Sequence, residues 1–65
     1  MRVRYFEDTD TLLIELRHVP VAETRDLDEN TVIDFDAKGN VCSITIEHAS
    51  VRADAPKFSF EKVAA

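Results

Sequence analysis

Closely spaced carboxylates are the residues of this sequence that first suggest chemistry. Glu7, Asp8 and Asp10 stand within four residues, in a polar break between two apolar stretches. Such a group could hold Ca²⁺ or Mg²⁺, which prefer oxygen ligands. The longer calcium-binding loop, with its glycine and distal glutamate, is absent, however. Because Asp10 can instead accept hydrogen bonds from its own turn, we expect turn structure here and no metal site.

A second pair of carboxylates, Asp34 and Asp36, alternates along an apolar stretch. Two such groups can divide acid and base roles when their surroundings separate their pKa values. That division needs a cleft, and a thin antiparallel sheet offers little concavity. We therefore expect both side chains to solubilise a strand, with Asp36 at the start of a turn.

The sequence holds two histidines, His18 and His48, and one cysteine, Cys42. A cysteine–histidine pair can act as a nucleophile when the thiolate is exposed in an electropositive setting. Cys42 shares a strand face with Ile44 and Ile46, which favours a small buried apolar side chain instead. We expect the histidines at the surface, no catalytic residue and no cofactor.

Alternation of apolar and polar residues dominates the chain and predicts β-strands. The best turn contains Gly39, which can take the left-handed conformation that closes a hairpin with a bulge. The predicted fold is mainly β: one domain over residues 1–65, with a five-stranded antiparallel meander in residues 1–46. The expected strands are residues 2–6, 11–16, 21–27, 31–35 and 41–46.

The C-terminal segment, residues 47–65, follows no single pattern. It can begin with a helical turn or two, capped by Ser50 or Asp54. Pro56 ends any helix before it. The residues beyond Pro56 can add a sixth strand or dock as an extended arm.

The small size of the chain, 65 residues and 7.4 kDa, predicts self-association. A domain of this length buries only about 60% of the surface that its unfolded chain exposes. A single cysteine excludes an intrachain disulfide, and no Cys/His cluster offers a structural zinc site. We expect a homodimer, with Phe58 and Phe60 as dimer contacts because aromatic residues are enriched in interface cores. Packing of these two side chains on their own sheet is the alternative.

Charge is unevenly distributed, since residues 7–36 hold ten acids against two bases in a chain of net charge −5. Nucleic-acid binders usually cluster bases on one face; only Arg2 and Arg4 lie together here, so we expect no nucleic-acid partner. An acidic surface more readily meets a basic protein. A solvated face that keeps the protein soluble is the alternative. The candidate partner-binding residues are Glu7, Asp8, Asp10 and Glu23.

We expect neither a secretory signal nor a membrane-spanning segment in this sequence. No apolar run follows the basic N-terminus, and none approaches the roughly 18 residues needed to cross a bilayer. An unpaired cysteine suits a reducing compartment. We expect a cytoplasmic protein without a membrane partner.

Two successions of residues resemble a known family in their order and gaps. The first comprises Tyr5 and residues 10–16 and 21–25; the second comprises residues 32–36, 39–41, 44–47 and 49–50. Over about residues 3–50, the chain resembles the short bacterial family of domains of unknown function that bears the number twenty-two eighty-three.

At two positions the sequence departs from the residues usual in that family, and we expect neither departure to change the fold. The family usually has an aromatic residue where Leu13 stands and often glycine where Ser43 stands. The resemblance implies a small β-rich prokaryotic protein without established activity, and it supplies no catalytic residues. Some relatives are similar to partners in two-gene toxin–antitoxin arrangements.

Two function classes remain open at this point. The first is a non-catalytic interaction module: a homodimer whose acidic face binds a basic protein, in an antitoxin-like role. The second is a ligand-binding or enzymatic domain with a site at the dimer seam. Only His18, His48 and Asp10 favour the second class.

Overall fold

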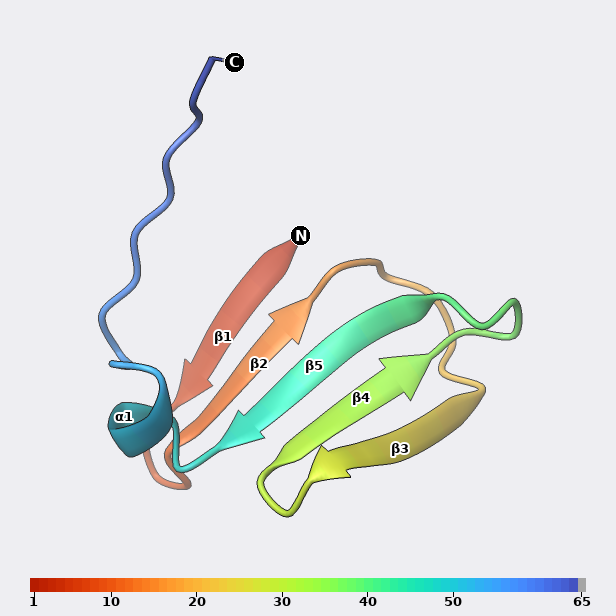
Figure 1. Cartoon of the computed structure of the whole chain (residues 1–65), viewed down its shortest axis with the longest axis horizontal. Helices are drawn as coiled ribbons and strands as arrows, with labels where there is room; N and C mark the ends of the chain where they lie inside the picture. Colours follow the sequence, from red (N-terminus) through yellow and green to blue (C-terminus); the bar gives the residue numbers. More distant parts are fainter. Residues whose placement is uncertain (65) are drawn as a thin grey trace.

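The computed structural model describes residues 1–64, so Ala65 of the predicted C-terminal segment lies outside the described residues. Five strands form one antiparallel sheet, followed by a short helix (Figure 1). This confirms the mainly-β fold class. The elements are β1 (Arg2–Phe6), β2 (Thr11–Glu15), β3 (Glu23–Asp28), β4 (Thr31–Phe35), β5 (Val41–Glu47) and α1 (Ala49–Arg52).

The order of the strands differs from the predicted meander. It is β1-β2-β5-β4-β3, so the last strand lies at the centre of the sheet. The connection over residues 16–22 is too long for a tight hairpin and passes the ends of β5 and β4. The Leu16 amide donates to the Cys42 carbonyl at 2.8 Å, and the Ala22 amide donates to the Phe35 carbonyl at 2.8 Å. β5 carries two buried side chains, more than any other strand, which fits its central place.

Strand register sorts the side chains onto two faces. Ile44 of β5 lies opposite Ile14 of β2 and Ile33 of β4. Their face, here called the apolar face, consists of half-buried side chains: Val3, Tyr5, Leu12, Ile14, Ile33, Phe35, Ile44 and Ile46. The opposite face, here called the polar face, carries a row across all five strands: Arg2, Glu15, Ser43, Asp34 and Thr24.

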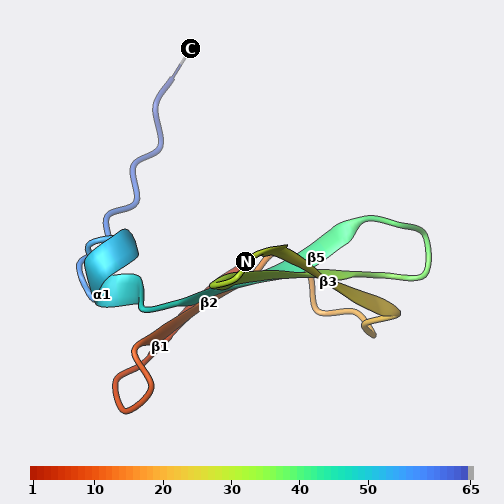
Figure 2. The same ribbon diagram turned by 60° about the horizontal axis from the view of Figure 1, so that its bottom comes forward.

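The buried core is very small. Its buried hydrophobic residues are Cys42, at 1% exposure, with Ala49 and Ala55. The burial predicted for Cys42 is thereby confirmed. Seen nearly edge-on, the sheet is a single layer, and α1 stands at one end of it (Figure 2). Most of the apolar face is therefore left open to solvent in the single chain.

The predicted turn between β4 and β5 is confirmed. The Asp36 carboxylate accepts hydrogen bonds from the Lys38 and Asn40 amides, each at 2.9 Å. Gly39 has φ of 83°, the left-handed conformation expected of it. The Asn40 amide is the main cause that lowers the pKa of the Asp36 carboxyl below its ordinary value of 3.8, and the Lys38 amide adds to it.

Candidate functional site

One end of the sheet gathers acidic residues from three connections. β1, β3 and β5 all run toward the end where α1 lies (Figure 1). We call the carboxylates there the acidic end: Glu7, Asp8, Asp10, Asp28, Glu29 and Glu47. Residues far apart in the sequence are thus brought to one region by the antiparallel topology.

Four members of the acidic end are exposed and free of ion pairs within residues 1–64: Glu7, Asp8, Glu29 and Glu47. Unpaired carboxylates at one end create a local negative potential, which attracts basic groups. This is the part of the site that a partner can reach.

Asp10 has a different role, because it is half-buried and its carboxylate accepts three hydrogen bonds. Its carboxylate accepts the Tyr5 hydroxyl at 2.6 Å, the Ser50 amide at 3.0 Å and the Ser50 hydroxyl at 2.7 Å. Its carbonyl accepts the Ala49 amide at 3.0 Å. The bond from Tyr5, followed by those from Ser50, lowers the pKa of the Asp10 carboxyl below 3.8. The same Asp10 bond raises the pKa of the Tyr5 phenol above 10.0.

The helix α1 depends on these long-range contacts. Four residues are too few for a helix to hold in isolation. Its N-cap residue, His48, has φ of 55° and makes no side-chain cap. The Asp10 carboxylate accepts a hydrogen bond from the Ser50 amide instead, so a residue of the β1–β2 loop caps the helix. Neither of the predicted caps, Ser50 or Asp54, fills the N-cap position.

A second tie to α1 comes from Arg52. Its guanidinium donates to the Asn30 carbonyl at 2.8 Å, the Thr31 hydroxyl at 2.9 Å and the Asp28 carboxylate at 3.2 Å. The Asn30 amide, at 2.8 Å, is the main cause that lowers the pKa of Asp28, and Arg52 adds to it. Arg52 therefore joins the helix to the β3–β4 turn across the acidic end.

Glu23, the fourth candidate partner-binding residue, lies elsewhere. It opens β3 opposite Phe35, at the other end of the sheet. Its carboxylate pairs with Arg25 at 3.1 Å, and the Arg25 guanidinium stacks over the Phe35 ring at 4.0 Å. The structure thus brings Glu7, Asp8 and Asp10 together but not Glu23.

The residues weighed for catalysis are dispersed. His18 follows β2 and His48 follows β5, and because these strands are antiparallel the two histidines lie at opposite ends, both exposed. The buried Cys42 thiol donates to the Asp34 carbonyl at 3.3 Å. The Asp34 carboxylate accepts the Ser43 hydroxyl at 2.6 Å on the polar face, whereas Asp36 lies in a turn. No nucleophile–base pair is assembled from these groups.

The basic strand β1 is partly neutralised. Arg4 lies 3.8 Å from the Glu15 carboxylate on β2 and 5.1 Å from the centre of the Phe6 ring. Arg4 thus pairs with an acid on the neighbouring strand, β2. Arg2 stands exposed on the same face.

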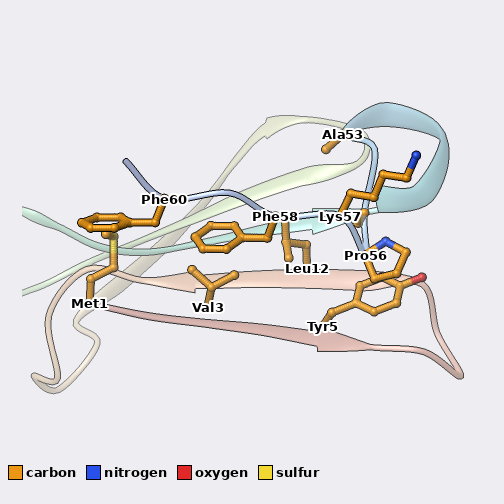
Figure 3. Close-up of a pocket in the computed structure, with 10 residues that line it drawn as sticks. Met1, Val3, Tyr5, Leu12, Ala53, Pro56, Lys57, Phe58 and Phe60 are labelled. Atoms are coloured by element: carbon orange, nitrogen blue, oxygen red, sulfur yellow. The ribbon is translucent and has the colours of Figure 1, made fainter. Parts of the chain in front are cut away.

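A turn follows α1, in which the Lys57 amide donates to the Asp54 carbonyl at 3.0 Å. Residues 57–64 then form an extended arm without strand structure. Phe58 and Phe60 are 65% and 74% exposed. The arm and β1 enclose an apolar groove of about 740 Å³. Figure 3 shows Phe58 and Phe60 facing Met1, Val3 and Leu12 across it.

Residues 1–64 hold neither a metal-binding cluster nor a membrane-spanning helix. No group of three or more His, Cys, Asp or Glu side chains there is arranged to hold a metal ion. No helix within that range is long and apolar enough to cross a membrane.

Sequence reasoning missed Arg52, Thr31 and the capping contact of Ser50. Thr31 is 6% exposed and receives the Arg52 guanidinium. Asp28, Asn30 and Thr31 lie more than twenty residues from Arg52, so no local spacing could reveal these contacts.

Comparison with known proteins adds a family match. A family model described as a protein of unknown function, DUF2283, matches residues 2–50. No curated protein and no solved structure matches the chain. The matched residues include Tyr5, Asp10, Ala49 and Ser50, so both sides of the contact between the first hairpin and α1 lie inside the match.

Proposed function

Because the chain belongs to the DUF2283 family of proteins of unknown function, we propose its function from its surface: a non-catalytic interaction module. In this proposal the protein is a cytoplasmic bacterial homodimer that binds a basic protein through its acidic end, in an antitoxin-like role. The observation that carries the proposal is the group of four exposed, unpaired carboxylates Glu7, Asp8, Glu29 and Glu47.

Rigid support of the acidic end favours binding over mere solubility. Asp10 and Arg52 fasten α1 to the β1–β2 loop and to the β3–β4 turn. The neighbouring carboxylates are therefore presented on a fixed frame, which lowers the entropic cost of binding a partner. Glu23 lies at the opposite end and is paired with Arg25, so it is left out of the proposed surface.

Homodimerisation is supported by the thinness of the fold. A single sheet has two faces, and a stable domain needs its apolar face covered by another layer. Residues 49–57 cover only the end of that face near Tyr5 and Leu12 (Figure 3).

Charge reversal tests the acidic end. The tagged protein is used to capture proteins from bacterial cytoplasm, in parallel with the double variant Glu7→Lys/Asp8→Lys. Asp26→Lys/Glu61→Lys is the matched control, since it makes the same charge change at exposed residues outside the acidic end. We expect one basic protein to be captured by the wild type and the control and lost with Glu7→Lys/Asp8→Lys. Equal capture by all three folded proteins, or equal loss from both variants, would reject the acidic end.

A ligand-binding role is the second candidate, and the apolar groove favours it. The groove holds about 740 Å³ beside Val3, Tyr5 and Leu12, with Lys57 also in its lining, which suits a ligand with a long apolar chain and one anionic group. A fatty acid titrated by calorimetry tests this role. Saturable binding that Val3→Glu abolishes would support it over the interaction module, and absence of heat would exclude fatty acids.

A further inference from the structure

The open part of the apolar face is a continuous strip at the middle of the sheet. Val3, Ile14, Ile44 and Ile33 lie side by side across four neighbouring strands. All four are half-buried, although each has the side chain of a core residue. In Figure 2 the helix α1 stands at one end of the sheet, away from its middle.

The folded chain exposes more surface than a compact monomer of the same mass. The folded chain exposes 5197 Å². A compact monomer of this mass exposes roughly 4,200 Å², so the excess is on the order of 1,000 Å². A standard interface buries about 800 Å² on each partner. The exposed arm, with Phe58 and Phe60, contributes to this excess together with the apolar face, so the arm and the face jointly offer an area of the size of one protein–protein interface.

The charge of the apolar face favours an identical face as its cover. Its charged side chains stand on the edge strand β3, and each has a partner of opposite sign. Glu23 pairs with Arg25 at 3.1 Å, and Asp28 pairs with Arg52 at 3.2 Å. A basic protein finds no free acid there, whereas a second copy brings no like charge against it. Self-complementary faces of this kind build two-fold dimers.

The arm supplies a second, independent argument. It lines a groove with Val3, Tyr5 and Leu12 of the apolar face, and in Figure 2 it rises away from the sheet. Sheets that pack face to face lie about 10 Å apart. Eight residues in extended conformation, from Lys57 to Ala64, span up to about 27 Å. The arm is thus long enough to cross a second sheet stacked on the first, and Phe58 and Phe60 are exposed where that layer would lie.

We propose that two copies of this chain stack through their apolar faces into a two-layer β-sandwich, and that each arm packs Phe58 and Phe60 against the other copy. This inference rests on the homodimerisation in the proposed function and gives it a geometry. Ile44, on the central strand, lies near the two-fold axis and faces Ile44 of the second copy. The groove beside β1 takes up apolar side chains of that copy.

Cross-linking at the central strand tests the stacking. In a Cys42→Ala background, Ile44→Cys places one thiol on the apolar face. Thr45→Cys, its neighbour on the polar face, is the matched control. With a short bismaleimide, we expect a covalent dimer from Ile44→Cys and none from Thr45→Cys. Cross-linking of Thr45→Cys alone, or of neither variant in a protein that sediments as a dimer, overturns the stacking but leaves homodimerisation standing. A wild-type monomer at millimolar concentration overturns both.

The arm is tested by the dissociation constant of the dimer, measured by sedimentation. Phe58→Ser/Phe60→Ser is expected to raise that constant about tenfold or more, as removal of two aromatic contacts does. Val63→Ser, which removes a side chain at 73% exposure further along the arm, is the control. Packing of the phenylalanines on their own sheet predicts a lower melting temperature with an unchanged dissociation constant, and that result overturns the role of the arm.

Discussion

Asp10 and Ser50, forty residues apart in the sequence, are joined by two hydrogen bonds. The Asp10 carboxylate accepts the Ser50 amide at 3.0 Å and the Ser50 hydroxyl at 2.7 Å. The same carboxylate accepts a third hydrogen bond, from the Tyr5 hydroxyl at 2.6 Å. One side chain thus caps the only helix of residues 1–64 and fixes it to the first hairpin.

The phenol of Tyr5 reports directly on this carboxylate. Tyr5 is the only tyrosine, and the chain has no tryptophan, so its ionisation can be followed by ultraviolet absorbance. We expect a midpoint above 10.0, because the hydrogen bond to Asp10 raises the pKa of the phenol. In Asp10→Asn the midpoint should return toward 10.0, while Asp8→Asn should leave it unchanged. Identical midpoints in wild type and Asp10→Asn would show that the bond does not form in solution.

Stability in acid should depend on three carboxylates, Asp10, Asp28 and Asp36, whose pKa values are all lowered from 3.8. The unfolded chain takes up protons at a higher pH than the folded chain, so protonation favours unfolding. The stabilisation is complete above about pH 5 and is lost as the pH falls through the lowered pKa values. Urea unfolding at a series of pH values measures it. In Asp10→Asn the free energy of unfolding should fall less steeply as the pH is lowered into the acid range. An unchanged slope would contradict the assignment to Asp10.

Arg52→Ala should loosen the helix from the β3–β4 turn. Loss of hydrogen bonds from a charged donor to the Thr31 hydroxyl and the Asn30 carbonyl is expected to lower the free energy of unfolding by about 1 kcal/mol. Denaturant titration at fixed protein concentration measures the change, since dimerisation makes stability depend on concentration. Arg2→Ala, which removes an exposed arginine of β1, is the control and should be neutral. Equal effects of the two changes would mean that the contacts of Arg52 add no stability.

Gly39→Ala probes the turn between β4 and β5. A Cβ at this position meets no atom within 4 Å, so any cost comes from the φ of +83° alone. The left-handed conformation costs an alanine about 1 kcal/mol relative to glycine. Thermal unfolding should show a lower midpoint for Gly39→Ala, whereas Ala37→Ser in the same turn should leave it unchanged. A midpoint equal to that of the wild type would mean that the turn changes its conformation to accept alanine.

The strands were predictable because alternation is a local signal. β1 and β4 have the predicted bounds, and β2 and β5 differ by one residue at one end. β3 begins two residues later than expected, at Glu23, in the least apolar of the five runs. The polarity of that run weakens the alternation, so its start could not be located from the pattern.

The order of the strands was beyond local reasoning. Each short break favours a hairpin, and residues 16–22 offer no signal that the chain passes over two strand ends instead. The same limit applies to the site. Glu7, Asp8 and Asp10 were found as a cluster because they are neighbours in the sequence, whereas the contacts of Asp10 with Ser50 and of Arg52 with Asp28 join distant segments.

The central place of β5 sets the order in which the sheet can be completed during synthesis. β1 pairs with the strand that follows it, β2, so both partners of that ladder are available once they have left the ribosome, and the same holds for β3 and β4. The two hairpins share no ladder until β5 enters between them and pairs with both β2 and β4. A nascent chain that stops before Val41 therefore carries two separate hairpins, each too small to be stable alone. Cooperative folding begins only when the sheet's last strand has emerged.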